Sequence, residues 1–169
     1  MIKFTFATFK NRFIFHGFMK VRFFIFRIIL YYAIFAGILT LIREIIKDIE
    51  DYKGDKLTNS NTFCIKYGIN NAKKLSLILE IIIIVMISLF QYFQYSIFFS
   101  EFEYNMSLWG VNIIAIVFAT FMQILMFLLL YKTYNAQSKR EFNICSKICK
   151  IIIFFGITSI PIFTYIHLN

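Results

Sequence analysis

The sequence has little of what a soluble chain or an unfolded chain requires. Only 16% of its residues are charged and 60% are apolar, whereas soluble domains average about 25% charged and about 45 to 50% apolar residues. A chain of 169 residues cannot bury such an excess in one core. One proline and six glycines exclude a collagen-like chain or a low-complexity linker, and the scarcity of polar runs excludes disorder. With a mean hydropathy of +0.73, the expected solvent is the lipid bilayer.

Cysteine is also scarce. Cys64, Cys145 and Cys149 form no C-x-x-C motif and have no histidine at ligand spacing, which excludes the common zinc sites. His16 and His167 have no carboxylate or thiol partner at a useful spacing. We therefore expect three free thiols near the membrane boundary.

Acidic residues are fewer than basic ones, nine against 18, so the net charge is +9. In a soluble chain this charge would favour nucleic acid as a partner. Here the lysines and arginines collect between apolar stretches, as they do in the cytoplasmic loops of membrane proteins. We therefore expect the membrane surface, and not nucleic acid, to be the partner of these charges.

Four apolar stretches predict an all-α fold, an integral membrane helical bundle with about four transmembrane helices. They cover residues 28–42, 75–99, 108–131 and 148–166. A spanning helix needs about 20 residues, so the second and third stretches suffice, and the first requires extension back through Arg27 and Arg22. Pro161 is expected to kink the last one.

The charges between these stretches predict a topology. Residues 43–74 hold seven basic side chains and residues 132–150 hold five, whereas Glu101 and Glu103 lie in a connection without a base. The first two segments should be cytoplasmic. Residues 1–27, with six bases and no acid, would then lie outside, against the positive-inside rule. Either residues 1–20 lie along the interface, or the chain is the tail of a longer protein.

Residues 43–56 contain the pattern D-x-x-D-x-x-x-D. In a helix, offsets of three and seven residues rotate by about 300° and 700°, which places Asp48, Asp51 and Asp55 on one stripe, together with Glu44. We expect the opposite side to hold Leu41, Ile42, Ile45 and Ile49. The pattern predicts an amphipathic helix that leaves the membrane and ends at Gly54, with Asp55 on the turn.

A stripe of carboxylates is destabilised by repulsion unless a cation neutralises it. Mg²⁺ is usually held by one or two carboxylates together with phosphates and waters. The alternative is a solvated face on which Arg43, Lys47, Lys53 and Lys56 pair with the acids. The spacing favours neither interpretation, but the position at the mouth of an apolar helix favours a metal.

The segment REIIKDIEDYKGDK at residues 43–56, followed by Thr62 and by Lys66-Tyr67-Gly68, resembles the second aspartate-rich motif of the UbiA superfamily of intramembrane prenyltransferases. It is most similar to the branch of digeranylgeranylglyceryl phosphate synthases. The resemblance implies a bundle of nine helices in which two such motifs hold Mg²⁺ against an isoprenyl diphosphate. It also implies transfer of the prenyl group to a lipid or aromatic acceptor.

The resemblance implies a role for individual residues. Asp48, Asp51 and Asp55 would bind the metal, and Arg43 and Lys47 would contact the diphosphate. Arg43 could equally be a snorkelling side chain at the membrane interface, and Lys53 and Lys56 are expected to be solvated. No catalytic residue is assigned. The expected localisation is the inner or plasma membrane, with the Asp-rich loop on the cytoplasmic side.

The sequence departs from the family pattern in two ways. It contains no N-D-x-x-D-x-x-x-D motif, and Thr62 is followed by Phe63-Cys64 where the family commonly has Leu-Pro. We therefore expect residues 21–169 to correspond to the C-terminal half of a UbiA-like domain, preceded by a basic aromatic segment at residues 1–20. The chain would supply the second half-site beside a separate N-terminal half, or would be a non-catalytic truncated or structural membrane protein.

Several other side chains have structural interpretations. Glu80 lies in an apolar stretch, where we expect snorkelling or pairing with Lys73 or Lys74. Hydrogen bonds between helices are expected from Gln91, Gln94 and Asn112. An aromatic belt is expected from Tyr92, Tyr95, Trp109, Tyr131 and Tyr134.

Overall fold

The computed structural model describes the backbone of residues 2–58, 60–100 and 113–168, and the side chains of residues 26, 29–58, 60–92 and 117–159. Its helices are α1 (Ile2–Leu57), α2 (Phe63–Tyr67), α3 (Ile69–Ser100), α4 (Ile113–Asn135) and α5 (Lys139–Leu168). No strand occurs in these described segments. The chain divides into two compact units, residues 1–35 and 36–169. In the first unit, residues 2–35 have helical backbone, and the division predicted after residue 20 stays a prediction.

Four helical segments are long and apolar enough to cross a membrane: Ile29–Leu57, Ile69–Tyr92, Val117–Asn135 and Lys139–Ser159. The prediction of an all-α membrane bundle with about four spans is confirmed. Large apolar side chains such as Ile81, Val117 and Ile124 are half exposed or more. In a bilayer these faces contact lipid, which is as apolar as they are.

The apolar stretches do not mark the ends of the helices. The first stretch continues as helix beyond residue 42, as the acidic motif predicts, and α5 begins at Lys139, ahead of the apolar stretch at residue 148. Both helices extend into polar sequence because one of their faces remains buried there, with Ile46 and Ile49 on α1 and Phe142 on α5. Apolar content alone does not detect such an amphipathic extension.

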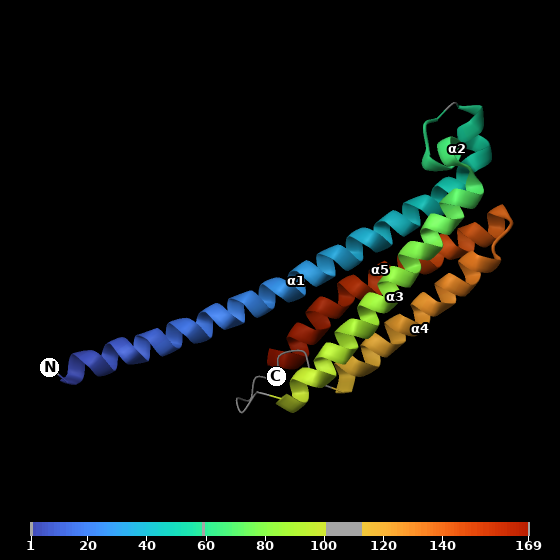
Figure 1. Cartoon of the computed structure of the whole chain (residues 1–169). Helices are drawn as coiled ribbons and strands as arrows, with labels where there is room; N and C mark the ends of the chain where they lie inside the picture. Colours follow the sequence, from blue (N-terminus) through green and yellow to red (C-terminus); the bar gives the residue numbers. More distant parts are fainter. Residues whose placement is uncertain (1, 59, 101–112, 169) are drawn as a thin grey trace. The chain divides into compact units, whose positions relative to one another are not determined.

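Within the second unit, α3 packs on α4 and α4 packs on α5 (Figure 1). The amide of Gln123 donates to Ser88 Oγ at 2.8 Å, and that of Gln91 donates to Thr120 Oγ1 at 3.4 Å. The rings of Phe121 and Phe155 meet edge to face, 5.3 Å between centroids, and link α4 to α5. The expected role of Gln91 between helices is confirmed.

Other predicted side chains are exposed or lie outside the described residues. Tyr92, Tyr131 and Tyr134 are exposed, as the aromatic belt requires. The following lie outside the described side chains: His16, Gln94, Tyr95, Glu101, Glu103, Trp109, Asn112, Pro161 and His167. The predictions for these residues remain untested.

Candidate functional site

The acidic motif lies on the last turns of α1, and its helical conformation is as predicted. Asp48 is repelled by the charges of Asp55, Glu44 and Asp51, in that order of strength. The four carboxylates therefore share one side of the helix. The predicted end at Gly54 is wrong, because α1 continues to Leu57 and Asp55 is helical.

The opposite face of α1 is apolar and buried, with one correction. Ile42, Ile45, Ile46 and Ile49 are 5% exposed or less, whereas Leu41, predicted to lie with them, is 50% exposed. Leu41 precedes Asp48 by seven residues, which rotates it to within about 20° of the acidic stripe. Ile46 follows Ile42 by four residues and therefore shares its buried face.

The chain after α1 folds back onto the acidic face. The N–H groups of Thr58 and Ser60 donate to the carbonyls of Gly54 and Asp55 at 3.2 and 3.0 Å, which closes the turn. The backbone N–H of Phe63, the first residue of α2, hydrogen-bonds the carboxylate of Asp48. Figure 1 shows α2 beside the end of α1. The altered Thr62-Phe63 step thus places a backbone donor on the acid.

Cys64 is fully buried behind this contact. Burial raises the pKa of the Cys64 thiol to about 11, and the nearby carboxylates of Asp48 and Asp55 contribute to the rise. The thiol is therefore protonated at neutral pH and does not act as a nucleophile. All three cysteines are free and buried, so the predicted free thiols are confirmed.

The basic residues of the motif are already paired with acids. Arg43 forms an ion pair with Glu44, and Lys47 Nζ lies 3.4 Å from Asp51 Oδ2. Lys139, at the start of α5, lies 3.6 Å from Asp51 Oδ1. Within the described part of the chain, Asp48 and Asp55 form no ion pair.

The carboxylate oxygens of the motif meet only some of the requirements for binding a hard cation. Among the described residues no three His, Cys, Asp or Glu side chains form a group that could hold a metal ion. Mg²⁺ at a diphosphate site, however, needs only one or two protein carboxylates, because phosphates and waters complete its coordination. Asp48 and Asp55 stand two helical turns apart, about 10 Å along the axis, so each would contribute a single carboxylate to a cation that phosphates and waters complete, whereas Asp51 would first have to release its lysines. The chemistry of the residues therefore fits Mg²⁺ that arrives with a diphosphate.

A second link joins α1 to α5. The amide of Asn143 donates to Glu50 Oε1 at 2.7 Å, and this contact is partly buried. The beginning of α5 is set by Glu141, whose Oε2 accepts from the N–H groups of Gln137 and Ser138 at 2.7 and 2.8 Å. The spacing Ser138-x-x-Glu141 is a capping box, a local signal that marks where this helix starts.

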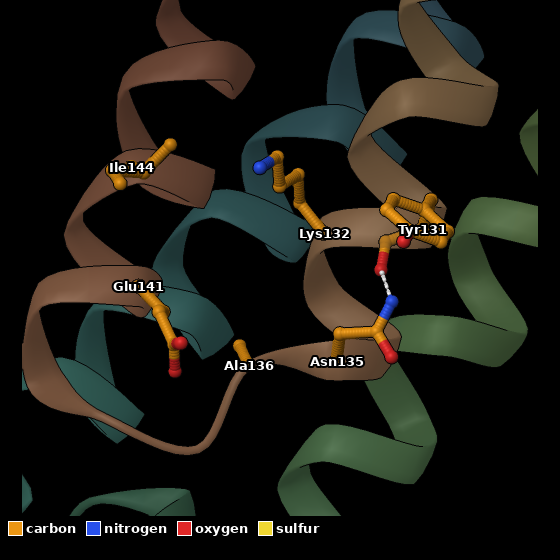
Figure 2. A pocket seen from close by; sticks show the side chains of 6 residues that line it. All are labelled: Tyr131, Lys132, Asn135, Ala136, Glu141 and Ile144. Atoms are coloured by element: carbon orange, nitrogen blue, oxygen red, sulfur yellow. Dashed lines mark hydrogen bonds between the residues drawn. The ribbon is translucent and has the colours of Figure 1, made fainter.

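The turn between α4 and α5 borders a cavity of about 180 Å³ (Figure 2). It is lined by Tyr131, Lys132, Asn135, Ala136, Glu141 and Ile144. Lys73 of α3 donates to the Ala136 carbonyl at 2.7 Å, and Glu141 is occupied by the helix cap. The polar groups that line this cavity are therefore explained by the contacts that close the turn between α4 and α5.

The prediction that Glu80 snorkels or pairs with a lysine is wrong. It is fully buried and forms no salt bridge within the described residues, because it lies between helices and not at the interface. Ser76 Oγ donates to its Oε1 at 3.0 Å. The hydroxyl of Thr133 of α4 interacts with the same carboxylate, although its geometry does not reach that of a full hydrogen bond to Oε2 of Glu80.

Comparison with known proteins confirms that the chain resembles the digeranylgeranylglyceryl phosphate synthases. The chain is 36% identical over 120 residues to the digeranylgeranylglyceryl phosphate synthase of Methanosphaera stadtmanae, covering 69% of this chain and 38% of that protein. It is 43% identical over 54 residues to the synthase of the same name from Saccharolobus solfataricus, covering 32% of this chain and 19% of that protein. The match to the first relative thus spans little more than a third of its length. No family model matches the chain, and no solved structure matches it significantly.

Proposed function

We propose, from the homology of this integral membrane protein to part of the UbiA-type digeranylgeranylglyceryl phosphate synthases, that it supplies one carboxylate half-site for prenyl transfer from an isoprenyl diphosphate. The relatives are named for a product that contains two geranylgeranyl groups on glyceryl phosphate. A phosphorylated glycerol lipid is therefore the proposed class of acceptor. The proposed orientation places the acidic face on the cytoplasmic side, where the basic loops are expected.

The observation that supports this proposal most strongly is the environment of the Asp48 carboxylate. Its carboxylate shares a face with Asp55, is held by the N–H of Phe63, and has no ion pair among the described residues. The four acids together favour the arrival of a cation because their mutual repulsion is then relieved. A substrate that carries a cation and a phosphate suits this face better than an anion alone.

The roles of the residues follow from their contacts. Asp48 and Asp55 would offer oxygens to Mg²⁺, and Asp51 would join them as its ion pairs open. Arg43 and Lys47 would then turn from acids to phosphate oxygens, which accept charge-assisted hydrogen bonds. When bound, Mg²⁺ stabilises the charge that develops on the diphosphate leaving group.

The chain matches only part of its relatives, and the family implies a second aspartate-rich motif. We therefore expect turnover only when the remaining part is supplied, either in one longer protein or by a second polypeptide. The coding sequence upstream of residue 1 tests this expectation directly. A stretch that encodes N-D-x-x-D in that region would agree with it, and unrelated sequence would count against it.

A non-catalytic membrane protein is the second candidate. It is favoured by the two lysines that already neutralise Asp51 and by the absence of a preformed metal group among the described residues. In that case the acidic face is a solvated helix end whose ion pairs add little to stability.

A titration of the purified chain with inorganic pyrophosphate, with and without Mg²⁺, separates the two candidates. The prenyltransferase proposal predicts binding that requires Mg²⁺ and weakens about tenfold or more in Asp48→Asn, because a charge-assisted contact contributes about 1.5 to 3 kcal/mol. Lys53→Gln removes one charge from an exposed side chain of the same helix and serves as the control, with binding within about twofold. Pyrophosphate binding that is the same with and without Mg²⁺ and is unchanged in Asp48→Asn would support the non-catalytic candidate.

A further inference from the structure

The last helix brings a cation to the acidic face that the motif itself does not contain. Lys139 is the first residue of α5 and lies 3.6 Å from Asp51 Oδ1. One helical turn later, Asn143 donates to Glu50 at 2.7 Å. Two successive turns of α5 therefore contact two neighbouring residues of α1. The backbone of Lys139 is therefore held beside this end of α1.

The side chain of Lys139 nevertheless remains free to move. It is 68% exposed, while the capping box formed by Ser138 and Glu141 holds the backbone on which it stands. A lysine of this kind acts as a mobile point charge with three donors. Its ion pair with the half-exposed Asp51 is weak because solvent screens it. Lys139 can therefore exchange its partner at little cost.

Positive charge exceeds negative charge around Asp51. Lys47 and Lys139 both contact this single carboxylate, whereas Asp48 and Asp55 form no ion pair in the described residues. A cation held by the acids would satisfy Asp51 and release both lysines. Each released ammonium group would then lie beside an incoming phosphate.

We propose that Lys139 is a diphosphate-binding residue contributed by the last helix, which Asp51 holds in place until substrate arrives. This inference rests on the proposed function, since it requires a diphosphate at the acidic face. It adds a contact from a segment outside the aspartate-rich motif. It also gives Asp51 a positioning role in the free protein, beside its proposed role toward the metal.

The test is the affinity of the full chain for inorganic pyrophosphate in the presence of Mg²⁺, measured by calorimetry in detergent. Lys139→Ala should raise the dissociation constant about tenfold, the loss of one charged contact, and Lys139→Arg should recover most of it. Lys147→Ala is the matched control, because Lys147 is an exposed lysine on the same helix. Its dissociation constant should stay within about twofold.

A second measurement tests the exchange itself. Without Mg²⁺, where the wild-type chain should not bind pyrophosphate measurably, Asp51→Asn releases Lys47 and Lys139 and should make weak binding detectable, whereas the double variant with Lys139→Ala should lose most of this gain. The inference is overturned if wild-type binding depends on Mg²⁺ and on Asp48 but is unchanged in Lys139→Ala. If the wild-type chain binds no pyrophosphate at all, the proposed function fails as well, so the two failures are distinguishable.

Discussion

Replacing Glu80 with glutamine should stabilise the protein. Glu80 is fully buried, its Oε1 accepts one hydrogen bond of 3.0 Å from Ser76, and its Oε2 accepts none. Thr133 Oγ1 is buried beside this carboxylate and interacts with it without a well-formed hydrogen bond. Glutamine has nearly the same shape but no charge, so it avoids the cost of burying a carboxylate, and its amide nitrogen adds a donor on the side of the Thr133 hydroxyl. The substitution therefore removes a buried charge without opening a cavity.

The size of the gain follows from these contacts. A hydrogen bond between membrane helices contributes about 0.6 kcal/mol on average, and an unpaired buried polar atom costs about 1 to 3 kcal/mol. We expect Glu80→Gln to raise the free energy of unfolding by about 1 to 2 kcal/mol. For a chain of this size the corresponding rise in Tm is about 2 to 8 °C.

The assay is unfolding in mixed micelles, by SDS titration at 25 °C and by heating. Ser76→Ala is the opposing variant, since it removes the hydrogen bond to Oε1 of Glu80 and should cost about 1 to 2 kcal/mol. Thr133→Val removes the buried hydroxyl at constant shape and should be neutral or stabilising. A fall in stability for Glu80→Gln would show that the carboxyl group itself is required, and the argument from the buried charge would be refuted.

Three further substitutions or measurements test other parts of the fold. Gly68→Ala should destabilise by about 1 kcal/mol because φ at this position is +84°, where a Cβ is strained; Gly37→Ala in α1 is the control, and equal effects would contradict the argument. Asn143→Ala should cost about 1 kcal/mol in thermal unfolding through loss of its bond to Glu50, and an unchanged Tm would exclude this link. Cys64 should react with a maleimide far more slowly in the folded chain than in SDS at pH 8, because its pKa is raised from 9.0 to about 11. The unfolded thiol loses its proton first, so this group contributes stability below pH 9 that is lost between pH 9 and about 11; a folded-state labelling rate equal to that in SDS would disprove the burial.

The acidic motif shows which structural features a local sequence pattern can predict. The helical periodicity correctly placed Asp48, Asp51 and Asp55 on one face of α1, because the rotation per residue is a property of the backbone. The same rule, applied consistently, places Leu41 in line with Asp48, and Leu41 is accordingly exposed. That error came from grouping residues by polarity and not by angle.

The ends of the helices were less predictable. Gly54 is a common stop signal, yet α1 passes through it to Leu57. The start of α5 carries a capping box at Ser138 and Glu141, which a search for S-x-x-E would have found. The apolar stretch of α5 begins only nine residues after Lys139. Hydropathy indicates the part of a helix that contacts lipid, whereas a capping box indicates the residue at which the helix begins.

The composition and periodicity by themselves determined that this protein is a helical membrane protein with an acidic stripe on its first spanning helix, since both depend on residues that are near one another in the chain. Only the tertiary structure decided which partners meet that stripe. Glu50 and Asn143 lie 93 positions apart, Lys139 reaches Asp51 from another helix, and Glu80 is buried between helices instead of at the interface. Such contacts depend on how the helices pack against each other, and the side chains of one segment do not specify which segment will lie beside it.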